Sequence, residues 1–576
     1  MTTPRLVAIL LALALLAAAC GSSSEDNASP EVEADSVSEP EPTTAEEPAP
    51  QPDEPDATPT PIVDLVESDG DATSGGTLRI GLEADVDGLN PTTSALSAPG
   101  LTMAGTVFDT LMALDADGNA VPYLAASIEP VDDALSRWRM VLREGVMFHD
   151  GTPLDAEAVR LNFDSQVSSP LVGIAVRPFV PSEGAIEVID DLTVEFQLLE
   201  GSAAFPAVLT SQLGMVASPT WLAAAATDPA LNQSPVGTGP FRIESRSQDA
   251  STVVVRNDDW WGGEVRLDAV EFLIVVDPAQ RGALLREGAL DGLHVWDPAT
   301  VSDLFEAGEI QNIVDETGDE TFLMLNSQAP PFDDIRARQA LALATPLQNY
   351  RTLIGLGVSR PADQMFIPES PFHNPDVVQR GDDPVGAAEL AATYCADAPD
   401  NCTDGKIDME YQFVGGSVVN NRSAEILAEG WESAFNVEFD ELAQDAHIQQ
   451  TALGQYEAVI WRGFGGREPI NSRINLMCRT VGPISINFVR YCDESRDALI
   501  LEVQATEDFD TRVSLWQEIV RNINEAYTHV FLTHTLWDTA FGPDVRGVCD
   551  RTSPEGVALR CVSNGRMWFQ SVWLDS

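Results

Sequence analysis

The chain has 576 residues, with 32 basic and 91 acidic side chains and a formal net charge of −59. Such an acidic surface repels nucleic acid and anionic lipid headgroups, which argues against either as a partner. With 44% hydrophobic residues the chain can bury a substantial core, and its length suits two to four domains.

The first 76 residues have the character of an export signal and a linker. After Arg5, residues 6–16 form an apolar segment too short to span a bilayer permanently, and Ala17-Ala18-Ala19 precede Cys20. This resembles a bacterial lipoprotein signal over 1–20, with Cys20 as the lipidated residue. Residues 21–76 are mostly Glu, Asp, Pro, Ser, Thr and Ala, which predicts a disordered acidic tether.

The folded part begins with an expected strand in which Leu78, Ile80 and Leu82 alternate with polar residues. A polar loop over residues 83–91 follows it, and a helix is expected over 101–112. The polar side chains of this loop include Glu83, Asp85 and Asn90.

Residues 138–166 predict a hairpin that leads into a helix. Trp138, Met140 and Leu142 alternate with mostly polar neighbours, which is a largely period-two pattern. Residues 146–148 suit a short return strand, and Asp155 stands where a helix N-cap is expected. The presence of His149 and Asp150 is explained by the turn that they form with Gly151, and a catalytic role for the pair is not needed.

Strands and helices alternate through the rest of the chain. The same patterns predict strands over 192–198, 253–255, 270–276, 321–326, 407–414, 437–439, 457–461 and 530–532, and helices over 278–287, 330–344, 421–434, 499–503 and 515–523. This mixture predicts an α/β (mixed α+β) fold.

Six cysteines remain besides Cys20. An even number in an exported chain favours disulfides, and no C-x-x-C spacing or histidine cluster suggests a metal site or a metal cofactor. Fifteen pairings are open, of which pairing in sequence order is our guess. The candidates are Cys395, Cys402, Cys478, Cys492, Cys549 and Cys561.

The run LREGVMFHDGTPLDAEAV resembles the signature of family 5 extracellular solute-binding proteins, the capturing subunits of peptide/nickel-type ABC importers. GGTLRIG, VGTGPF, DWWGG, LLREGALDG and PPFDDIRARQALALA match the family in the same order. The resemblance implies a two-lobed, periplasmic-binding-protein-like fold that closes on a ligand, with an extra domain in the first lobe. It divides the body into a first lobe over 77–325 with the extra domain at about 101–218, a second lobe over 326–529, and a return to the first lobe over 530–576.

The resemblance also places residues 457–469 along the cleft. It makes Glu83, Asp85 and Asn90, in the loop after the first strand, candidates to face the cleft from the other lobe. In peptide binders of this family a Trp ends the strand that corresponds to 457–461, and an Asp three residues later pairs with the peptide's amino terminus. Trp461 matches the Trp, but Phe464 stands at the Asp position, while Arg462 and Arg467 bring positive charge. Either the arginines favour an anionic or neutral polar ligand, or they face solvent or pair with Glu457 and Glu468.

The expected function is therefore a non-enzymatic, monomeric binding lipoprotein without a cofactor, anchored at the outer face of the cytoplasmic membrane. It would capture a peptide or similar small solute and deliver it to ABC permease subunits. A sensing or adhesive lipoprotein remains an alternative. A secreted hydrolase is disfavoured because G-x-S-x-G and H-E-x-x-H are both absent.

Overall fold

The structure, a computed structural model, describes residues 72–463, 469–506 and 508–575, all within a unit that runs from Pro59 to Ser576. Cys20 and nearly all of the predicted tether lie outside the described residues. Among the helices described, none is long and apolar enough to cross a membrane.

The largest sheet has 11 strands, of which ten follow one path and β15 pairs with β14. Along that path it contains β13 (Cys402–Thr403), β14 (Lys406–Val414), β16 (Ala458–Gly463), β12 (Gln311–Leu325), β17 (His529–Phe541), β11 (Gly292–Val295), β1 (Thr77–Leu82), β10 (Ala269–Ile274), β9 (Ser251–Arg256) and β8 (Phe241–Ser247), with β15 at Phe435–Leu442. The strands predicted from alternation are therefore present, and most are longer than predicted.

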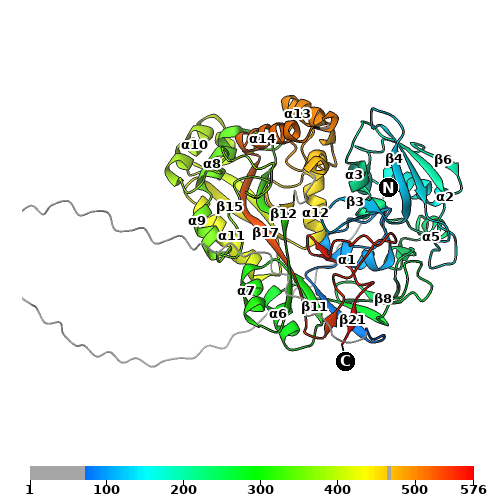
Figure 1. Cartoon of the computed structure of the whole chain (residues 1–576). Coiled ribbons are helices and arrows are strands. Elements are labelled where there is room, and N and C mark those ends of the chain that lie inside the picture. Colours follow the sequence, from blue (N-terminus) through cyan, green and yellow to red (C-terminus); the bar gives the residue numbers. More distant parts are fainter. Residues whose placement is uncertain (1–71, 464–468, 507, 576) are drawn as a thin grey trace, which may run out of the picture. The chain divides into compact units, whose positions relative to one another are not determined.

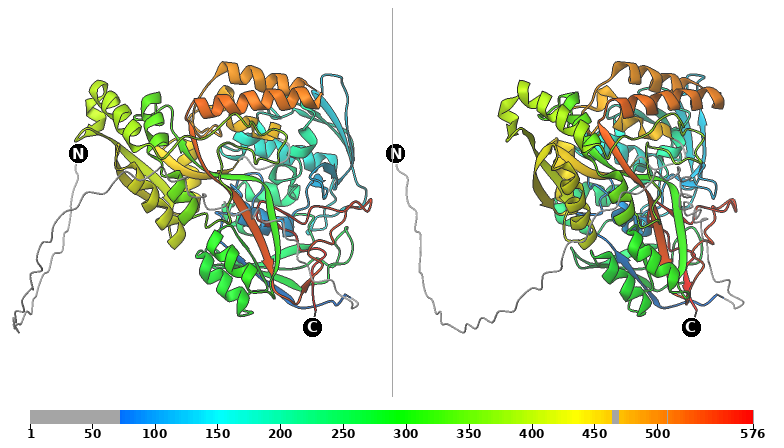
Figure 2. Two further views of the ribbon diagram at one scale, coloured as in Figure 1. Left: turned by 60° about the vertical axis from the view of Figure 1, so that its left-hand side comes forward. Right: turned by 90° about the vertical axis from the view of Figure 1, so that its left-hand side faces the viewer.

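Two long antiparallel strands, β12 and β17, run side by side through the middle of this sheet (Figures 1 and 2). Every residue of β17 is buried, because apolar layers cover it along its length. One end of the pair contributes Ile313 and Phe541 to a core around β1 and β10. The other end contributes Leu323 and Leu532 to a second core around β14 and α11 (Val418–Trp431). The molecule thus has two lobes joined by these strands, and the predicted fold class is confirmed.

A separate four-stranded antiparallel sheet belongs to the N-terminal part of the chain. It has the order β4 (Ala125–Pro130), β5 (Arg137–Leu142), β7 (Thr193–Gln197) and β6 (Ile186–Asp190), and it shares a core with α2 (Ala156–Ser168). The N-cap is as predicted, since Asp155 accepts a hydrogen bond from the Ala158 amide at 2.8 Å. Residues 146–148 do not return along β5. Their backbone bonds go forward, from Phe148 to Thr152 and from Leu154 to Val146.

The helices pack on the lobes to which their strands belong. The predicted helix over 101–112 begins earlier and ends at Val107, because Met112 is already in the next strand. The helix predicted from residue 330 begins at Ile335, after Asp334 caps the Arg336 amide. The helices besides α2 and α11 are α1 (Ala98–Val107), α3 (Val172–Val176), α4 (Phe205–Val208), α5 (Pro219–Ala225), α6 (Pro278–Arg286), α7 (Pro298–Glu306), α8 (Ile335–Ala344), α9 (Leu347–Leu353), α10 (Pro384–Asp397), α12 (Gln444–Leu453), α13 (Glu494–Ala505) and α14 (Phe509–Glu525).

Short elements complete the fold. Five 3₁₀ turns are described, at Gln212–Gly214, Pro229–Gln233, Pro399–Asn401, Pro469–Asn475 and Cys478–Thr480. The small strands are β2 (Met112–Leu114), β3 (Ala120–Pro122), β18 (Val545–Arg546), β19 (Val562–Ser563), β20 (Arg566–Met567) and β21 (Trp573–Leu574). The last four lie after β17: β19 and β20 form a hairpin, and β18 pairs with the more distant β21.

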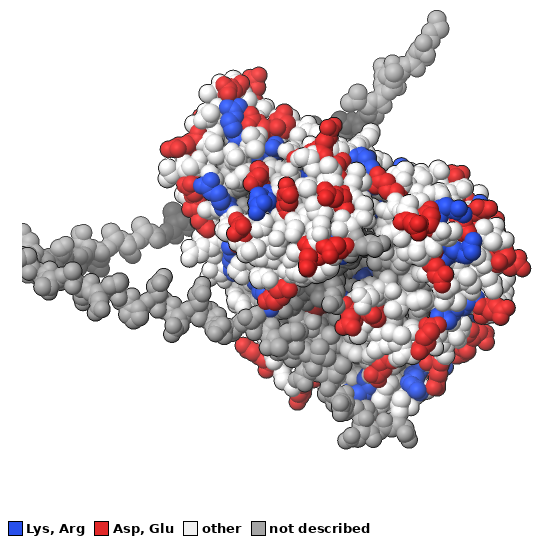
Figure 3. Space-filling model, turned by 45° about the horizontal axis from the view of Figure 1, so that its top comes forward, with Lys and Arg blue, Asp and Glu red and all other residues white. Residues whose placement is uncertain are grey.

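Acidic side chains dominate the face of the molecule drawn in Figure 3, with arginines scattered among them. Many of the arginines are paired, as in the network that joins Arg160 to Glu157 and Asp164. The charge is therefore spread over the folded body, which favours solubility and repels polyanions.

Candidate functional site

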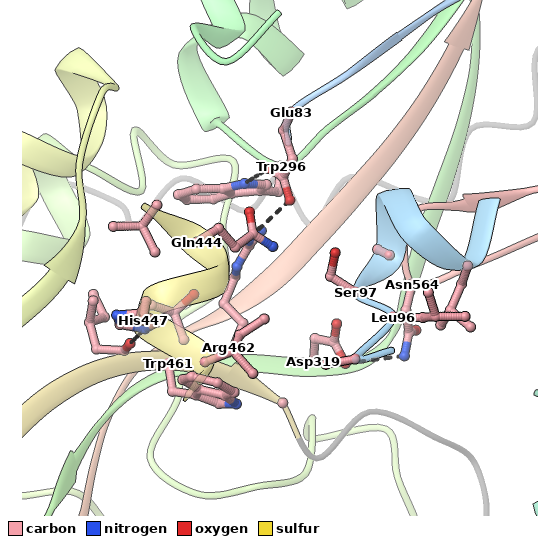
Figure 4. A pocket seen from close by; sticks show the side chains of 18 of the residues that line it. Glu83, Leu96, Ser97, Trp296, Asp319, Gln444, His447, Trp461, Arg462 and Asn564 are labelled. Atoms are coloured by element: carbon pink, nitrogen blue, oxygen red, sulfur yellow. Dashed lines mark hydrogen bonds and ion pairs between the residues drawn. The ribbon is translucent and has the colours of Figure 1, made fainter. Parts of the chain in front are cut away.

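A cavity of about 680 Å³ opens beside the carboxyl end of β1. Its walls come from distant parts of the chain: the segment before α1, the residue after β11, strands β12, β16 and β17, the N-terminal turns of α11 and α12, and the β19–β20 turn. Elements of both lobes therefore line one space, which is the size expected of a small-molecule site. Figure 4 shows part of this lining.

Glu83 and Arg462 form an ion pair in the cavity wall, with 3.1 Å between the guanidinium nitrogen and the Oε1 of Glu83 (Figure 4). Glu83 follows β1 and Arg462 lies on β16, so the pair joins the two lobes. Trp296 Nε1 donates to Glu83 Oε2 at 2.7 Å, and the guanidinium lies 4.3 Å from the ring centre of Trp296 and 5.0 Å from that of Trp537. Arg462 is thus held between two indoles and one carboxylate.

Burial opposes ionisation of Glu83, but the positive charges of Arg462 and Arg281 and the ring of His294 outweigh it and lower its pKa to about 2. The carboxylate is therefore ionised at neutral pH. His294 Nε2 accepts from the Glu83 amide at 3.2 Å while its Nδ1 bonds the Gly565 carbonyl at 2.9 Å. This arrangement defines a neutral imidazole, and burial lowers the pKa of His294 to about 4.

Trp461 forms an aromatic wall of the cavity. Its ring stacks on His447 with centroids 5.3 Å apart and meets Phe488 edge-on at 5.0 Å. His447 is fixed by hydrogen bonds to Gln412 at 3.1 Å and the Ile460 carbonyl at 3.2 Å, and burial lowers its pKa to about 4. The wall is therefore apolar and uncharged at neutral pH, and it suits a flat or apolar part of a ligand.

The end of the cavity opposite Trp461 is polar (Figure 4). Asp319 on β12 accepts from Trp537 Nε1 at 3.0 Å and from Asn564 Nδ2 at 3.1 Å. Burial raises the pKa of Asp319. Arg566 lines the same cavity from β20. Sequence reasoning missed Trp296, Asp319 and Arg566. The one available signal was the Asn564-Gly565 dipeptide, which marks a hairpin turn.

The predicted site residues Asp85 and Asn90 do not line the cavity. The Asp85 carboxylate lies 2.7 Å from Arg246 and also accepts from the Asp249 amide, while Asn90 bonds Thr92 and Asn232. Both side chains brace the loop after β1 against neighbouring segments. Asp85 and Asn90 therefore lie outside the lining of this cavity. Glu83, from the same loop, does reach the cavity.

Two further candidates, Phe464 and Arg467, lie outside the described residues, as does Cys20. The other cysteines form three disulfides, Cys395–Cys402, Cys478–Cys492 and Cys549–Cys561, which join them in sequence order. Within the described ranges, no group of three His, Cys, Asp or Glu side chains could hold a metal ion.

The sequence and the fold are similar to those of known solute-binding proteins. The sequence profile of the bacterial extracellular solute-binding proteins, family 5 (middle region), matches residues 119–480. The dipeptide-binding protein of Escherichia coli is 23% identical over 73% of this chain and 82% of its own length. A di/tripeptide-binding protein of Pseudomonas aeruginosa is 25% identical over 83% of this chain and 93% of its own length.

Solved structures share the fold. A periplasmic binding protein of Helicobacter pylori in complex with the peptide STSA has a TM-score of 0.74 at 20% identity, covering 88% of this chain and 99% of its own. An Agrobacterium binding protein in complex with agropinic acid also has a TM-score of 0.74 at 20% identity, covering 87% and 99%. Proteins of this fold thus occur with peptide and with non-peptide ligands.

Proposed function

This chain belongs to family 5 of the bacterial extracellular solute-binding proteins, and from that premise we propose that it is the capturing subunit of an ABC importer. It binds a peptide or similar small organic solute in the cavity and delivers it to permease subunits in the membrane. Its task is to bind and release a solute, so it is not an enzyme and needs no cofactor. It functions as a monomer.

The observation that carries the proposal is that one cavity is walled by both lobes. Glu83 belongs to the lobe of β1, while Arg462 and Trp461 belong to β16 of the other. A ligand that contacts both walls favours the closed arrangement by its additional contacts there, which is how binding is coupled to a hinge motion. The long strands β12 and β17 join the lobes and are the natural hinge.

Anchoring at the outer face of the cytoplasmic membrane is part of the proposal. Its supports are the apolar segment over 6–16, Cys20 and the acidic sequence over 21–76. A lipid on Cys20 would hold the chain at the membrane, and the self-repelling tether would let the body reach its permease.

The ligand is expected to differ from an ordinary peptide bound through its amino terminus, because Phe464 stands where peptide binders of the family carry an Asp. The cavity offers an aromatic wall at Trp461 and a polar end at Asp319 and Arg566. An organic solute with an apolar body and a polar end fits both features.

A thermal-unfolding screen of the full chain against peptides, oligosaccharides, organic acids and nickel tests the proposal. A ligand present at a hundred times its dissociation constant adds about 2.7 kcal/mol of stability, which raises the unfolding midpoint. A binding protein gives at least one such rise, and Trp461→Ala reduces it, to about 1.4 kcal/mol of added stability if the affinity falls tenfold. The control is Phe509→Ala, which removes an exposed aromatic outside the cavity. No rise with any class would contradict capture and favour a sensing or adhesive role.

A further inference from the structure

The C-terminal segment contributes a hairpin to the cavity wall. Strands β19 and β20 pair through Val562–Met567 and Ser563–Arg566, and Asn564 and Gly565 turn the chain with φ of 50° and 73°. Two consecutive positive φ values are typical of a tight two-residue hairpin turn. The Cys549–Cys561 disulfide closes the loop just before this hairpin, so the turn rises from a cross-linked base.

The tip of the hairpin is fixed at three points. The Asn564 amide donates to Asp315 at 2.7 Å, the Asn564 side chain donates to Asp319 at 3.1 Å, and the Gly565 carbonyl bonds His294 at 2.9 Å. A side chain at position 565 would meet Trp537, since a Cβ there lies 2.5 Å from that ring. The hairpin is therefore built into the wall and holds Arg566 in one place.

Arg566 has donors to spare. Its guanidinium donates to the Ser211 hydroxyl at 2.9 Å and to the carbonyl and hydroxyl of Ser563 at 3.1 Å each. These are neutral acceptors, and no ion pair of Arg566 is found among the described residues, since the nearby carboxylate of Asp315 pairs with Arg560 at 3.0 Å. A guanidinium has five N–H groups, so two remain for another partner.

The two other arginines of the described lining are held differently. Arg462 has Glu83 as its counter-ion, although its Nη1 has no hydrogen-bond partner among the described residues. Arg281 donates to the carbonyls of Val275, Val276 and His294 and is almost fully buried. The carboxylate of Asp319 is occupied by Trp537 and Asn564, both neutral donors. Arg566 is therefore the partly exposed arginine of the described lining that has no carboxylate as a counter-ion.

The start of α1 lies along the same wall and adds donors. Ser97, its N-cap, lines the cavity without capping the helix, and its hydroxyl has no hydrogen-bond partner among the described residues. The hairpin is joined to this helix by the Met567 amide, which donates to Thr102 at 3.4 Å. A helix N-terminus favours a negative group, which adds to the attraction of Arg566.

We propose that Arg566, with Ser97 and the first turn of α1, binds a carboxylate of the captured solute. The inference rests on the proposed function and deepens it, because it assigns the ligand an acidic end and assigns the C-terminal hairpin a role in selectivity. Burial lowers the pKa of Arg566 to about 10, so the guanidinium keeps its charge at neutral pH.

The test compares acids with their amides. The probes are trialanine and N-(3-phenylpropionyl)glycine, each as the free acid and as the primary amide, measured by calorimetry against the full chain. Because a charge-assisted hydrogen bond is worth a factor of about ten or more, the acid of a binding pair is expected to bind at least about tenfold more tightly than its amide.

Arg566→Met is expected to remove that discrimination, and Arg566→Lys to keep part of it, because lysine retains the charge without the planar fork. The matched control is Arg338→Met, which removes a buried guanidinium bonded to the carbonyls of Phe332 and Ala526 outside the cavity. Arg338→Met is expected to bind the acid more tightly than the amide, as the wild type does. If Arg566→Met does not fold, Arg566→Lys and Ser97→Ala still report on the preference.

Two outcomes would overturn the inference and leave the proposed function standing: equal affinity for acid and amide, or binding of neutral oligosaccharides alone. An undiminished acid preference in Arg566→Met would also overturn it. If no compound of any class binds, the carboxylate subsite and the proposed function fail together.

Discussion

Arg462 on β16 reaches across to Glu83 at the end of β1, and the two charges meet at 3.1 Å between the indoles of Trp296 and Trp537. This contact bridges the two lobes. The pair therefore contributes both to the stability of the fold and to the wall that a ligand meets.

Replacing Glu83 by Gln is expected to lower the free energy of unfolding by about 2 kcal/mol, because a partly buried guanidinium loses its counter-ion while Trp296 keeps an acceptor. A double-mutant cycle with Arg462→Met, followed by urea unfolding, measures the coupling. A coupling energy near zero would show that the pair contributes nothing to stability.

Acid is expected to destabilise the protein in two stages. His294 is neutral in the fold, with a pKa of about 4 against an unfolded value of about 6.5, so its contribution is present above pH 6.5 and is lost as the pH falls toward 4. Glu83 has a folded pKa of about 2, so its contribution is present above about pH 4.5 and is lost as the pH falls toward 2.

His294→Gln separates these stages, since an amide can accept from Glu83 and donate to Gly565 without titrating. Urea unfolding at pH 7.5 and pH 4.5 measures how much the free energy of unfolding falls on acidification. This fall is expected to be smaller by about 2 kcal/mol in the variant than in the wild type. Parallel pH profiles for the two proteins would contradict the assignment.

Two glycines with positive φ allow the hairpin packing to be measured. Gly565→Ala places a Cβ 2.5 Å from Trp537, whereas Gly556→Ala, at a φ of 80°, places its Cβ in open space. Both changes strain the backbone by about 1 kcal/mol, but only Gly565→Ala adds a clash. Thermal unfolding is expected to rank Gly565→Ala as clearly the less stable, and equal stabilities would refute this account of the turn.

Membrane anchoring is tested by Cys20→Ser. The wild-type chain is expected in the membrane fraction of the cell and the variant in the soluble extracytoplasmic fraction, because one residue carries the lipid. Fractionation followed by immunoblotting measures this. A variant that stays with the membrane would require another anchor.

Sequence patterns predicted the fold well because they are local. The alternation of Leu78, Ile80 and Leu82 and the cap at Asp155 need only neighbouring residues, and both appear as expected. The predicted ends of helices were less accurate. The helix expected over 101–112 ends at Val107, because Met112 instead pairs with Pro122 of β3, which the local pattern does not reveal.

The site was less predictable because it is assembled from distant segments. The family resemblance made Trp461 and Glu83 candidates, at a strand end and in the loop after a strand, and both line the cavity. Asp85 stands two residues from Glu83, yet it turns to Arg246, which lies in another hairpin. Arg566 joins the site only because the chain returns after β17, and no spacing in the sequence encodes that return.

If this cavity holds the solute, its aromatic wall at Trp461 contributes to binding. The affinity of the tightest ligand from the screen is measured by calorimetry for the wild type and for Trp461→Ala. Binding is expected to be weaker by about tenfold or more in the variant, with the ligand-free unfolding midpoint within a few degrees of the wild type. Unchanged affinity would remove Trp461 from the binding wall and contradict the assignment of the cavity.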